Sequence, residues 1–167
     1  MDDDPAAAKE LIAAGRDQAQ AALAELRELV RGIAPSILLD RGLVSAIESI
    51  ASRASVPTEL VAEGLDPAAR LPLAVERTAY FVAAEGLANV AKHSGASRCR
   101  VKIGRIDDRL LVEITDDGRG GARVESGRGL RALIGRVEAV DGSLSVSSPV
   151  GGRTVVLAEI PIRYEPR

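Results

Sequence analysis

The sequence contains few aromatic residues and no excess of basic ones. Only 2% of its 167 residues are aromatic, tryptophan is absent, and the formal net charge is -2. Proteins that bind single strands stack bases on aromatic rings, and general nucleic-acid binders need an excess of Lys and Arg to neutralise phosphates. We therefore expect no nucleic-acid partner. Hydrophobic residues still make up 46% of the chain, so Leu, Ile, Val and Ala must form its core.

Cysteine and histidine occur once each, as Cys99 and His93. A single cysteine excludes an intrachain disulfide and a cysteine-based zinc site, and it fits a reducing compartment. No apolar run approaches the roughly 20 residues that span a bilayer, and the N-terminal Met-Asp-Asp-Asp is acidic where a signal peptide is basic. We expect a cytoplasmic segment without membrane contact, whose parent protein would be free to carry an anchor elsewhere.

The first 35 residues predict a long helix. Residues 6–34 lack proline and are rich in Ala, Leu, Glu and Arg, which are strong helix formers. Leu23, Leu26, Val30 and Ile33 follow a 3-4-3 spacing that is typical of a coiled-coil or helix-bundle seam. The simpler alternative is an amphipathic helix that packs on its own domain. Because Pro35 ends the pattern, we predict a helical segment over 1–35 and a separate domain over 36–167.

The pattern after residue 36 alternates helices and strands. Helices are predicted over 40–54, 72–94 and 130–140, with strands over 56–62, 98–106, about 110–114, 143–148 and 153–160. Strands joined by tight turns pair antiparallel. The order therefore predicts an α/β fold, a two-layer sandwich in which helices cover one face of a mixed sheet.

Polar residues recur along one face of the predicted helix 72–94. Glu85, Asn89 and His93 are spaced four residues apart, which places them in a row, and Lys92 lies beside them. Carboxylate and amide oxygens suit Mg²⁺ that is also bound by substrate phosphates, and lysine pairs with phosphate. The alternative is a solvated polar face on a surface helix.

Two glycine-rich segments follow. Asp116-Asp117-Gly118-Arg119-Gly120 comes directly after a predicted strand, where glycines allow close approach to a ligand and a carboxylate can accept a hydrogen bond from an amine. Gly127-Arg128-Gly129-Leu130 precedes a predicted helix, where backbone N–H groups can face an anion. This second segment is neither a Walker loop nor a good dinucleotide fingerprint. Considered separately, the first segment is equally compatible with an ordinary turn, and the second is a weak signal for which a plain helix start is the simpler interpretation.

Taken in order, these segments resemble a known family. Residues 85–93 resemble the N box of the ATPase fold shared by histidine kinases, gyrase, Hsp90 and MutL. Residues 116–120 are similar to its Asp-x-Gly-x-Gly box, residues 127–130 to the next glycine box, and Gly151-Gly152-Arg153-Thr154 to its closing Gly-Thr element. Residues 26–35 and the helix after Gly129 further resemble sensor histidine kinases of the nitrate-sensor and desaturase-sensor group.

The resemblance implies roles for individual residues. Glu85 would be the catalytic carboxylate, and Glu85 and Asn89 would bind Mg²⁺. The implied contacts to ATP come from Asn89, Lys92, His93, Asp116, Gly118, Gly120, Gly127, Gly129, Leu130 and Thr154. Among them, Asp116 would accept a hydrogen bond from the adenine amine. Arg119, Arg123 and Arg128 are further candidates for phosphate contacts.

One element of the family is missing from the sequence. Such kinases carry an acceptor histidine on the first helix of a dimerisation hairpin, yet residues 6–34 resemble only the second helix and contain no histidine. We predict that the chain transfers the ATP γ-phosphate to a histidine supplied in trans or on a removed segment. The implied partners are a response regulator and an acceptor-bearing chain or second copy bound through helix 6–34. The alternatives are a non-catalytic module that docks to a partner kinase and an anti-sigma-type serine kinase.

Overall fold

The computed structural model describes residues 35–65, 70–122 and 128–163. The predicted helix over 6–34 lies outside these residues, so its role in a bundle and the division at residue 35 stay predictions. The helices of the described part are α2 (Ser36–Ala51), α3 (Leu73–Asn89) and α4 (Arg128–Glu138), and a π-helical segment over Val90–Ser94 continues α3. The strands are β1 (Thr58–Glu63), β2 (Cys99–Ile106), β3 (Arg109–Asp116), β4 (Ser143–Ser147) and β5 (Thr154–Pro161).

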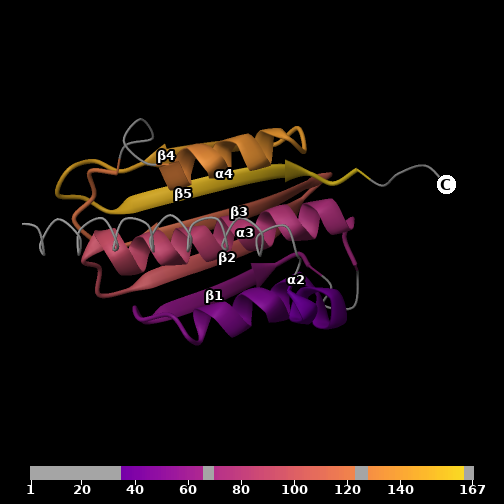
Figure 1. Cartoon of the computed structure of the whole chain (residues 1–167), viewed down its shortest axis with the longest axis horizontal. Helices are drawn as coiled ribbons and strands as arrows, with labels where there is room; N and C mark the ends of the chain where they lie inside the picture. The colour runs from indigo at the N-terminus through magenta and orange to yellow at the C-terminus, as the bar shows by residue number, and fades with distance from the viewer. Residues whose placement is uncertain (1–34, 66–69, 123–127, 164–167) are drawn as a thin grey trace, which may run out of the picture. The chain divides into compact units, whose positions relative to one another are not determined.

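The strands form one sheet in the order β1-β2-β3-β5-β4. β1 runs parallel to β2, and the other three pairings are antiparallel. Figure 1 shows α2, α3 and α4 on the same face of this sheet. The predicted two-layer α/β sandwich with a mixed sheet is therefore confirmed. Among the described residues, no helix is long and apolar enough to cross a membrane.

The alternation of side chains along the strands creates two different sheet faces. On the helix-covered face, β2, β3 and β5 contribute fully buried residues, which include Val101, Ile103, Val112, Ala158 and Ile160. On the opposite face the neighbouring positions are charged and paired across strands, as in Arg100–Glu59 at 2.8 Å and Lys102–Glu63 at 2.9 Å. One face thus packs the core while the other meets water.

Two predicted helices differ from those observed. The first helix begins at Ser36 and not at residue 40. It is kinked at Gly42, whose φ of 81° and ψ of 179° are not helical. The second was expected to run regularly over 72–94, yet its last turn is π-helical and ends at Gly95 in the left-handed conformation. Both departures occur at residues held by contacts from distant parts of the chain, which sequence periodicity does not report.

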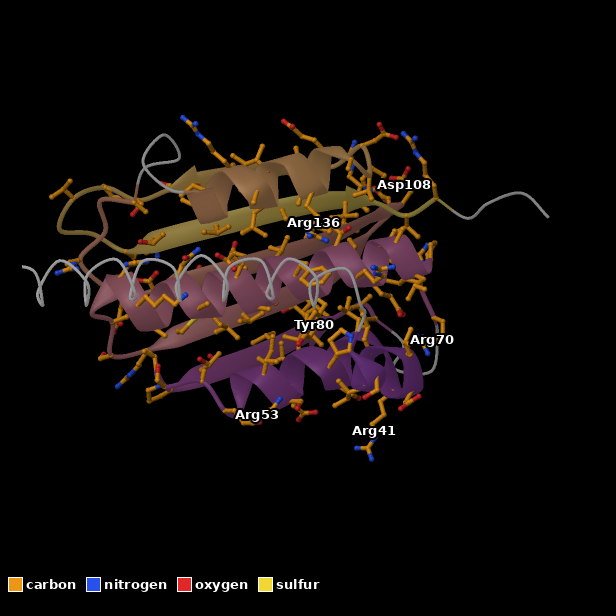
Figure 2. The ribbon with its side chains drawn as sticks, viewed as in Figure 1. Arg41, Arg53, Arg70, Tyr80, Asp108 and Arg136 are labelled. Carbon is orange, nitrogen blue, oxygen red and sulfur yellow. The ribbon has the colours of Figure 1, made fainter. Side chains whose placement is uncertain are left out.

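Aromatic and basic side chains connect α3 to α4. The guanidinium of Arg136 lies 4.3 Å from the centre of the Phe81 ring, and Phe81 meets Tyr80 edge to face. Figure 2 shows Arg136 and Tyr80 in the helical layer. Leu133 and Val137 of α4 are buried in the hydrophobic core. These contacts hold the middle and the last turn of α4 against α3 and the core.

Cys99 is expected to resist alkylation in the folded protein. Its side chain is buried on the helix-covered face, and this burial raises the pKa of the thiol to about 11 from an ordinary 9.0. Two pKa units lower the reactive thiolate fraction about a hundredfold at neutral pH. The iodoacetamide reaction should therefore be slow at pH 8, rise with pH towards about 11, and become fast in urea. Equal rates in native buffer and urea would contradict this assignment.

Candidate functional site

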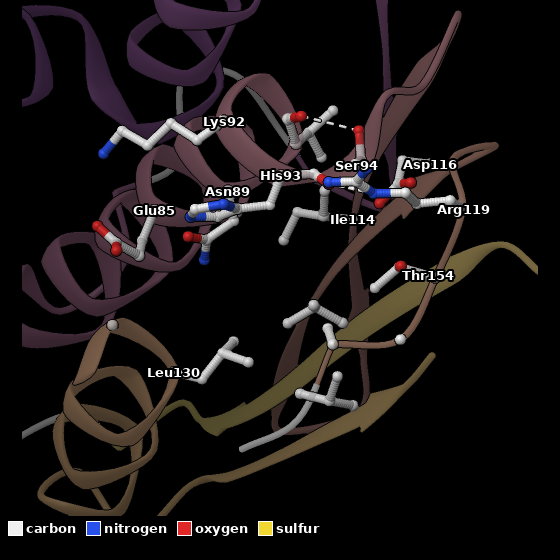
Figure 3. A pocket seen from close by; sticks show the side chains of 18 residues that line it. Glu85, Asn89, Lys92, His93, Ser94, Ile114, Asp116, Arg119, Leu130 and Thr154 are labelled. Atoms are coloured by element: carbon white, nitrogen blue, oxygen red, sulfur yellow. Dashed lines mark hydrogen bonds between the residues drawn. The ribbon is translucent and has the colours of Figure 1, made fainter. Parts of the chain in front are cut away.

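A cavity of about 590 Å³ opens between the C-terminal part of α3, the ends of β3 and β5, and the start of α4. It brings together ten of the residues that the sequence singled out: Glu85, Asn89, Lys92, His93, Asp116, Arg119, Gly120, Gly129, Leu130 and Thr154. Figure 3 shows the labelled side chains around this space. Gly118 lies beside the cavity without lining it, and Gly127 lies outside the described residues, as does Arg123.

Glu85, Asn89 and His93, the row of polar residues that the sequence indicated, all line the cavity, but the helix changes from α-helical to π-helical before His93. Glu85 and Asn89 are half-buried and lie one helical turn apart. A π-helical turn contains more residues than an α-helical one, so His93 does not continue the row at α-helical spacing. His93 still lines the cavity, where its side chain is exposed and its carbonyl accepts a hydrogen bond from Arg119 Nε at 3.1 Å.

Asp116 occupies the end of β3 and is buried, with 4% of its surface exposed. Its Oδ1 accepts a hydrogen bond from the Gly118 amide at 2.9 Å. A Cβ on Gly118 would lie 2.5 Å from the Ser94 carbonyl oxygen and 2.6 Å from Asp116 Oδ1. Only glycine allows this approach, so the turn brings the π-helical segment and the buried carboxylate together.

The adjacent Asp117 has a different role. Its carboxylate accepts hydrogen bonds from the Ser97 amide at 2.8 Å, the Ser97 hydroxyl at 2.6 Å and the Arg98 amide at 2.9 Å. The Ser97 hydroxyl, together with these amides, lowers the pKa of Asp117 below its ordinary value. Asp117 therefore ties the end of β3 to the start of β2, and only Asp116 of the two acids lines the cavity.

The glycine-rich turn after β3 is paired with the loop between β4 and β5. Gly121 donates its amide to the Ser148 carbonyl at 3.0 Å, and Gly151 donates to the Arg119 carbonyl at 2.7 Å. Gly120 lies between them with a φ of 62°. The second loop leads into Thr154, which is the register partner of Asp116 across β3 and β5. Residues far apart in the sequence thus become neighbours at one wall of the cavity.

The start of α4 forms the opposite wall. A Cβ placed on Gly129 would lie 2.6 Å from Glu85 Oε1 and 4.0 Å from Asn89 Oδ1. The two side-chain oxygens therefore approach the first turn of α4, where the helix dipole favours negative charge. Among the described residues, no three His, Cys, Asp or Glu side chains gather to hold a metal ion.

Sequence reasoning missed the apolar floor of the cavity. Ile114, Val146 and Val156 line it, and each lies on a predicted strand. Ile114 shares a face of β3 with Asp116, and Val156 shares a face of β5 with Thr154, so the period of two could have assigned them. Ser94, which also lines the cavity, belongs to the π-helical segment and gave no such signal.

Sequence comparison relates the chain to known kinases. No protein-family model matches it. The sensor histidine kinase MctS of Rhizobium johnstonii is 30% identical over 151 residues, which cover 84% of this chain and 32% of MctS. The histidine-protein kinase/phosphatase UhpB of Salmonella typhimurium is 32% identical over 145 residues, which cover 83% of this chain and 28% of UhpB. The chain therefore spans about a third of the length of these relatives.

Structure comparison leads to the same group. The histidine kinase domain of the blue-light activated histidine kinase EL346 from Erythrobacter litoralis superimposes with a TM-score of 0.54 and 25% identity. The match covers 71% of this chain and 57% of that domain. The resemblance expected from the four ordered motifs is thus confirmed: the chain is related to sensor histidine kinases, and its described domain has the fold of their ATP-binding catalytic domain.

Proposed function

We propose that the chain is the ATP-binding catalytic module of a two-component histidine kinase and transfers the γ-phosphate of ATP to a histidine. The observation that carries the proposal is the convergence of four separate segments on one cavity. Four residues from four different elements line the same space: Glu85, Asp116, Gly129 and Thr154. The relatives are sensor histidine kinases, which supports a nucleotide as the ligand of that space.

The chemistry of the cavity suits adenine at one end and phosphates at the other. Asp116 is an acceptor for an exocyclic amine, and the apolar floor provides a surface for the flat ring. Lys92 lines the cavity on the side of Glu85 and Asn89, where it offers positive charge to phosphate oxygens, whereas Arg119 lies beside Asp116 (Figure 3). The glycines of the two loops have no side chain, so the loop backbone can approach the ligand closely.

The oxygens of Glu85 and Asn89 fit Mg²⁺ only in company with a substrate. Both approach the first turn of α4, and they are too few to form a cage by themselves. Mg²⁺ typically takes one or two protein oxygens and completes its shell with waters and phosphates. In this proposal Glu85 and Asn89 would hold the ion, and the ion would supply positive charge next to the transferred phosphoryl group.

Glu85 is also placed to act on the reaction itself. In phosphoryl transfer the attacking histidine nitrogen bonds to the γ-phosphorus while the bond to the bridging oxygen breaks and ADP leaves. The protein contributes mainly position and charge stabilisation to such a step. A half-buried carboxylate beside the α4 terminus fits that task, by orienting a water or supporting the ion site.

The acceptor in this proposal is a histidine other than His93. The His93 side chain lines the nucleotide cavity itself, so it lies beside the phosphates and not opposite the leaving group. The acceptor would be supplied in trans or by sequence beyond that given, and a response regulator would receive the phosphate. Residues 6–34 would join the chain to an acceptor-bearing partner or a second copy.

Calorimetry with ATP and Mg²⁺ tests the nucleotide site. The unaltered protein should bind, Asp116→Asn should weaken binding about tenfold or more because one hydrogen bond to the base becomes a mismatch, and Asn89→Asp should alter the Mg²⁺ dependence. Asp117→Asn is the matched control, because that neighbouring carboxylate bonds Ser97 and Arg98 away from the cavity. Unchanged affinity in both site variants would refute the assignment.

Labelled ATP tests the reaction class. The chain, incubated with a protein that carries an acceptor helix, should give a phosphoprotein whose label is lost in acid, as expected for phosphohistidine. An acid-stable label would indicate a serine kinase of the same fold, and nucleotide binding without any transfer would favour a docking module.

Gly129→Ala should slow phosphoryl transfer more than it weakens nucleotide binding. The new methyl group would meet Glu85 Oε1 at 2.6 Å, and this flexible carboxylate can turn away without unfolding the domain. A displacement of about 1 Å at a reacting group costs up to about 100-fold in rate, so we expect a 10- to 100-fold loss in transfer with ATP affinity within a few-fold.

The matched control is Gly135→Ala in the same helix, where nothing lies within 4 Å of the added Cβ. It should leave transfer unchanged and raise the free energy of unfolding by about 1 kcal/mol through helix propensity. Equal transfer rates in the two variants would show that the contact between Glu85 and Gly129 does not matter for catalysis.

A further inference from the structure

Ser148 holds the glycine-rich turn with both its backbone and its side chain. Its carbonyl accepts the Gly121 amide at 3.0 Å, and its hydroxyl oxygen accepts the next amide, that of Ala122, also at 3.0 Å. The same hydroxyl lies 2.9 Å from the hydroxyl of Thr154. Ser148 is half-buried and is not among the residues that line the cavity, whereas Ala122 and Thr154 are.

Either hydroxyl can be the donor in the bond between Ser148 and Thr154, so the hydrogen-bond inventory of each group decides what the network can do. A serine hydroxyl has one hydrogen to donate and two lone pairs that accept. The Ala122 amide donates to Ser148 Oγ, so the Ser148 hydrogen is available for Thr154 Oγ1. If Ser148 donates in that bond, the hydrogen of Thr154 is left to point elsewhere, and Thr154 lines the cavity.

We infer that Ser148 is a positioning residue that makes the Thr154 hydroxyl a hydrogen-bond donor towards the base of the bound nucleotide. Thr154 is the register partner of Asp116, so the wall would present an acceptor and a donor together. Adenine carries a donor amine beside an acceptor ring nitrogen, whereas guanine has an acceptor oxygen in place of the amine. The inference rests on the proposed nucleotide site and assigns part of its base preference to Ser148.

The consequence is a specific pattern of losses. Ser148→Ala removes the donor to Thr154 and the acceptor of the Ala122 amide while the backbone bond to Gly121 stays. The loss of one such hydrogen bond corresponds to a change of about 3- to 10-fold in affinity. Because the Thr154 hydroxyl is then no longer held as a donor towards the base, ADP binding should weaken and GDP binding should change less. The ratio of the GDP to the ADP dissociation constant should therefore fall by a similar factor.

Calorimetry of the full chain with ADP and GDP in Mg²⁺ tests this pattern in four variants. Ser148→Ala and Thr154→Ala should each reduce the ADP preference, and the double variant should lose no more than Thr154→Ala alone, because Ser148 acts through Thr154. Ser148→Thr, which keeps the hydroxyl, should restore the preference. Ser147→Ala is the control, since its exposed side chain on β4 lies outside the network, and it should change nothing.

The outcomes separate this inference from the proposed function. No ADP binding by the unaltered protein would overturn both. Binding that Ser148→Ala leaves unchanged, with a lower melting temperature as the only effect, would overturn the inference alone and leave Ser148 as a purely structural residue. The inference would also be overturned if the double variant lost as much ADP preference as the two single variants together, because Ser148 would then act independently of Thr154.

Discussion

Replacing Gly120 with alanine is expected to abolish nucleotide binding and to lower the free energy of unfolding by about 3 kcal/mol or more. Gly120 has a φ of 62°, and a Cβ there would overlap the Pro149 carbonyl oxygen and lie 2.6 Å from that of Gly152. Both obstacles are backbone atoms, which cannot turn aside as a side chain can. The two loops must separate, and that removes the wall carrying Asp116 and Thr154. Urea unfolding and calorimetry with ADP measure the two effects.

Gly151→Ala provides the matched control for this prediction. Gly151 lies in the partner loop with a φ of 76°, but nothing is within 4 Å of a Cβ added there. Alanine should pay only the cost of the left-handed conformation, about 1 kcal/mol, and nucleotide affinity should persist. If both variants lost equal stability and Gly120→Ala still bound ADP, the close pairing of the loops would not be what forms the site.

Several features of the fold could be predicted because they depend on local periodicity. Val101 and Ile103 alternate with Arg100 and Lys102, which identifies a strand with one buried face, and the short turn after Ile106 implies an antiparallel return. The order of helices and strands then leaves a two-layer sandwich as the simplest arrangement. The convergence of residues from 85 to 154 on one cavity followed from the resemblance, since periodicity alone does not show which strand ends meet.

The local departures from regular structure could not be predicted in the same way. The π-helical turn at Val90–Ser94 places the Ser94 carbonyl where it accepts the Arg119 amide at 3.0 Å and contacts Gly118. That partner lies more than twenty residues away in the sequence. Likewise, neither the two bonds of Ser148 nor the contact of Glu85 with Gly129 leaves a pattern in the sequence, because each depends on how loops pack after the sheet has formed.

Arg70 illustrates the same dependence, and its removal is the second change with a large expected effect. Its guanidinium bonds both carboxylate oxygens of Glu76, at 3.1 and 2.9 Å. It also donates to the carbonyls of Leu39 at 2.8 Å and Leu38 at 3.0 Å, just before the break at Gly42. Figure 2 shows Arg70 at the end of the domain where α2 and the start of α3 meet. One side chain therefore joins a buried acid to the first turn of α2.

Arg70→Ala is expected to lower the free energy of unfolding by about 2 to 3 kcal/mol, because it leaves the buried Glu76 carboxylate uncompensated, although Arg70 itself is 46% exposed. The Glu76 side chain is only 2% exposed, and its remaining hydrogen bond would come from the Leu71 amide at 3.2 Å. Urea denaturation measures the change. Hydrogen exchange should also show faster opening of the first turn of α2, while ADP affinity stays within a few-fold because the nucleotide cavity does not include these residues.

Two further variants distinguish the cost of leaving the Glu76 charge buried and unpaired from the cost of losing an ion pair as such. Arg100→Ala breaks the Arg100–Glu59 pair at 2.8 Å, in which both side chains are 60% exposed, so it should cost no more than about 1 kcal/mol. Adding Glu76→Gln to Arg70→Ala removes the stranded charge, and the double variant should be less destabilised than the sum of the single variants. If the destabilisations of Arg70→Ala and Glu76→Gln added in full, the ion pair would contribute nothing. The stabilisation by Arg70 would then come from its hydrogen bonds to the α2 carbonyls, and the arginine would act chiefly by satisfying backbone groups in the first turn of that helix.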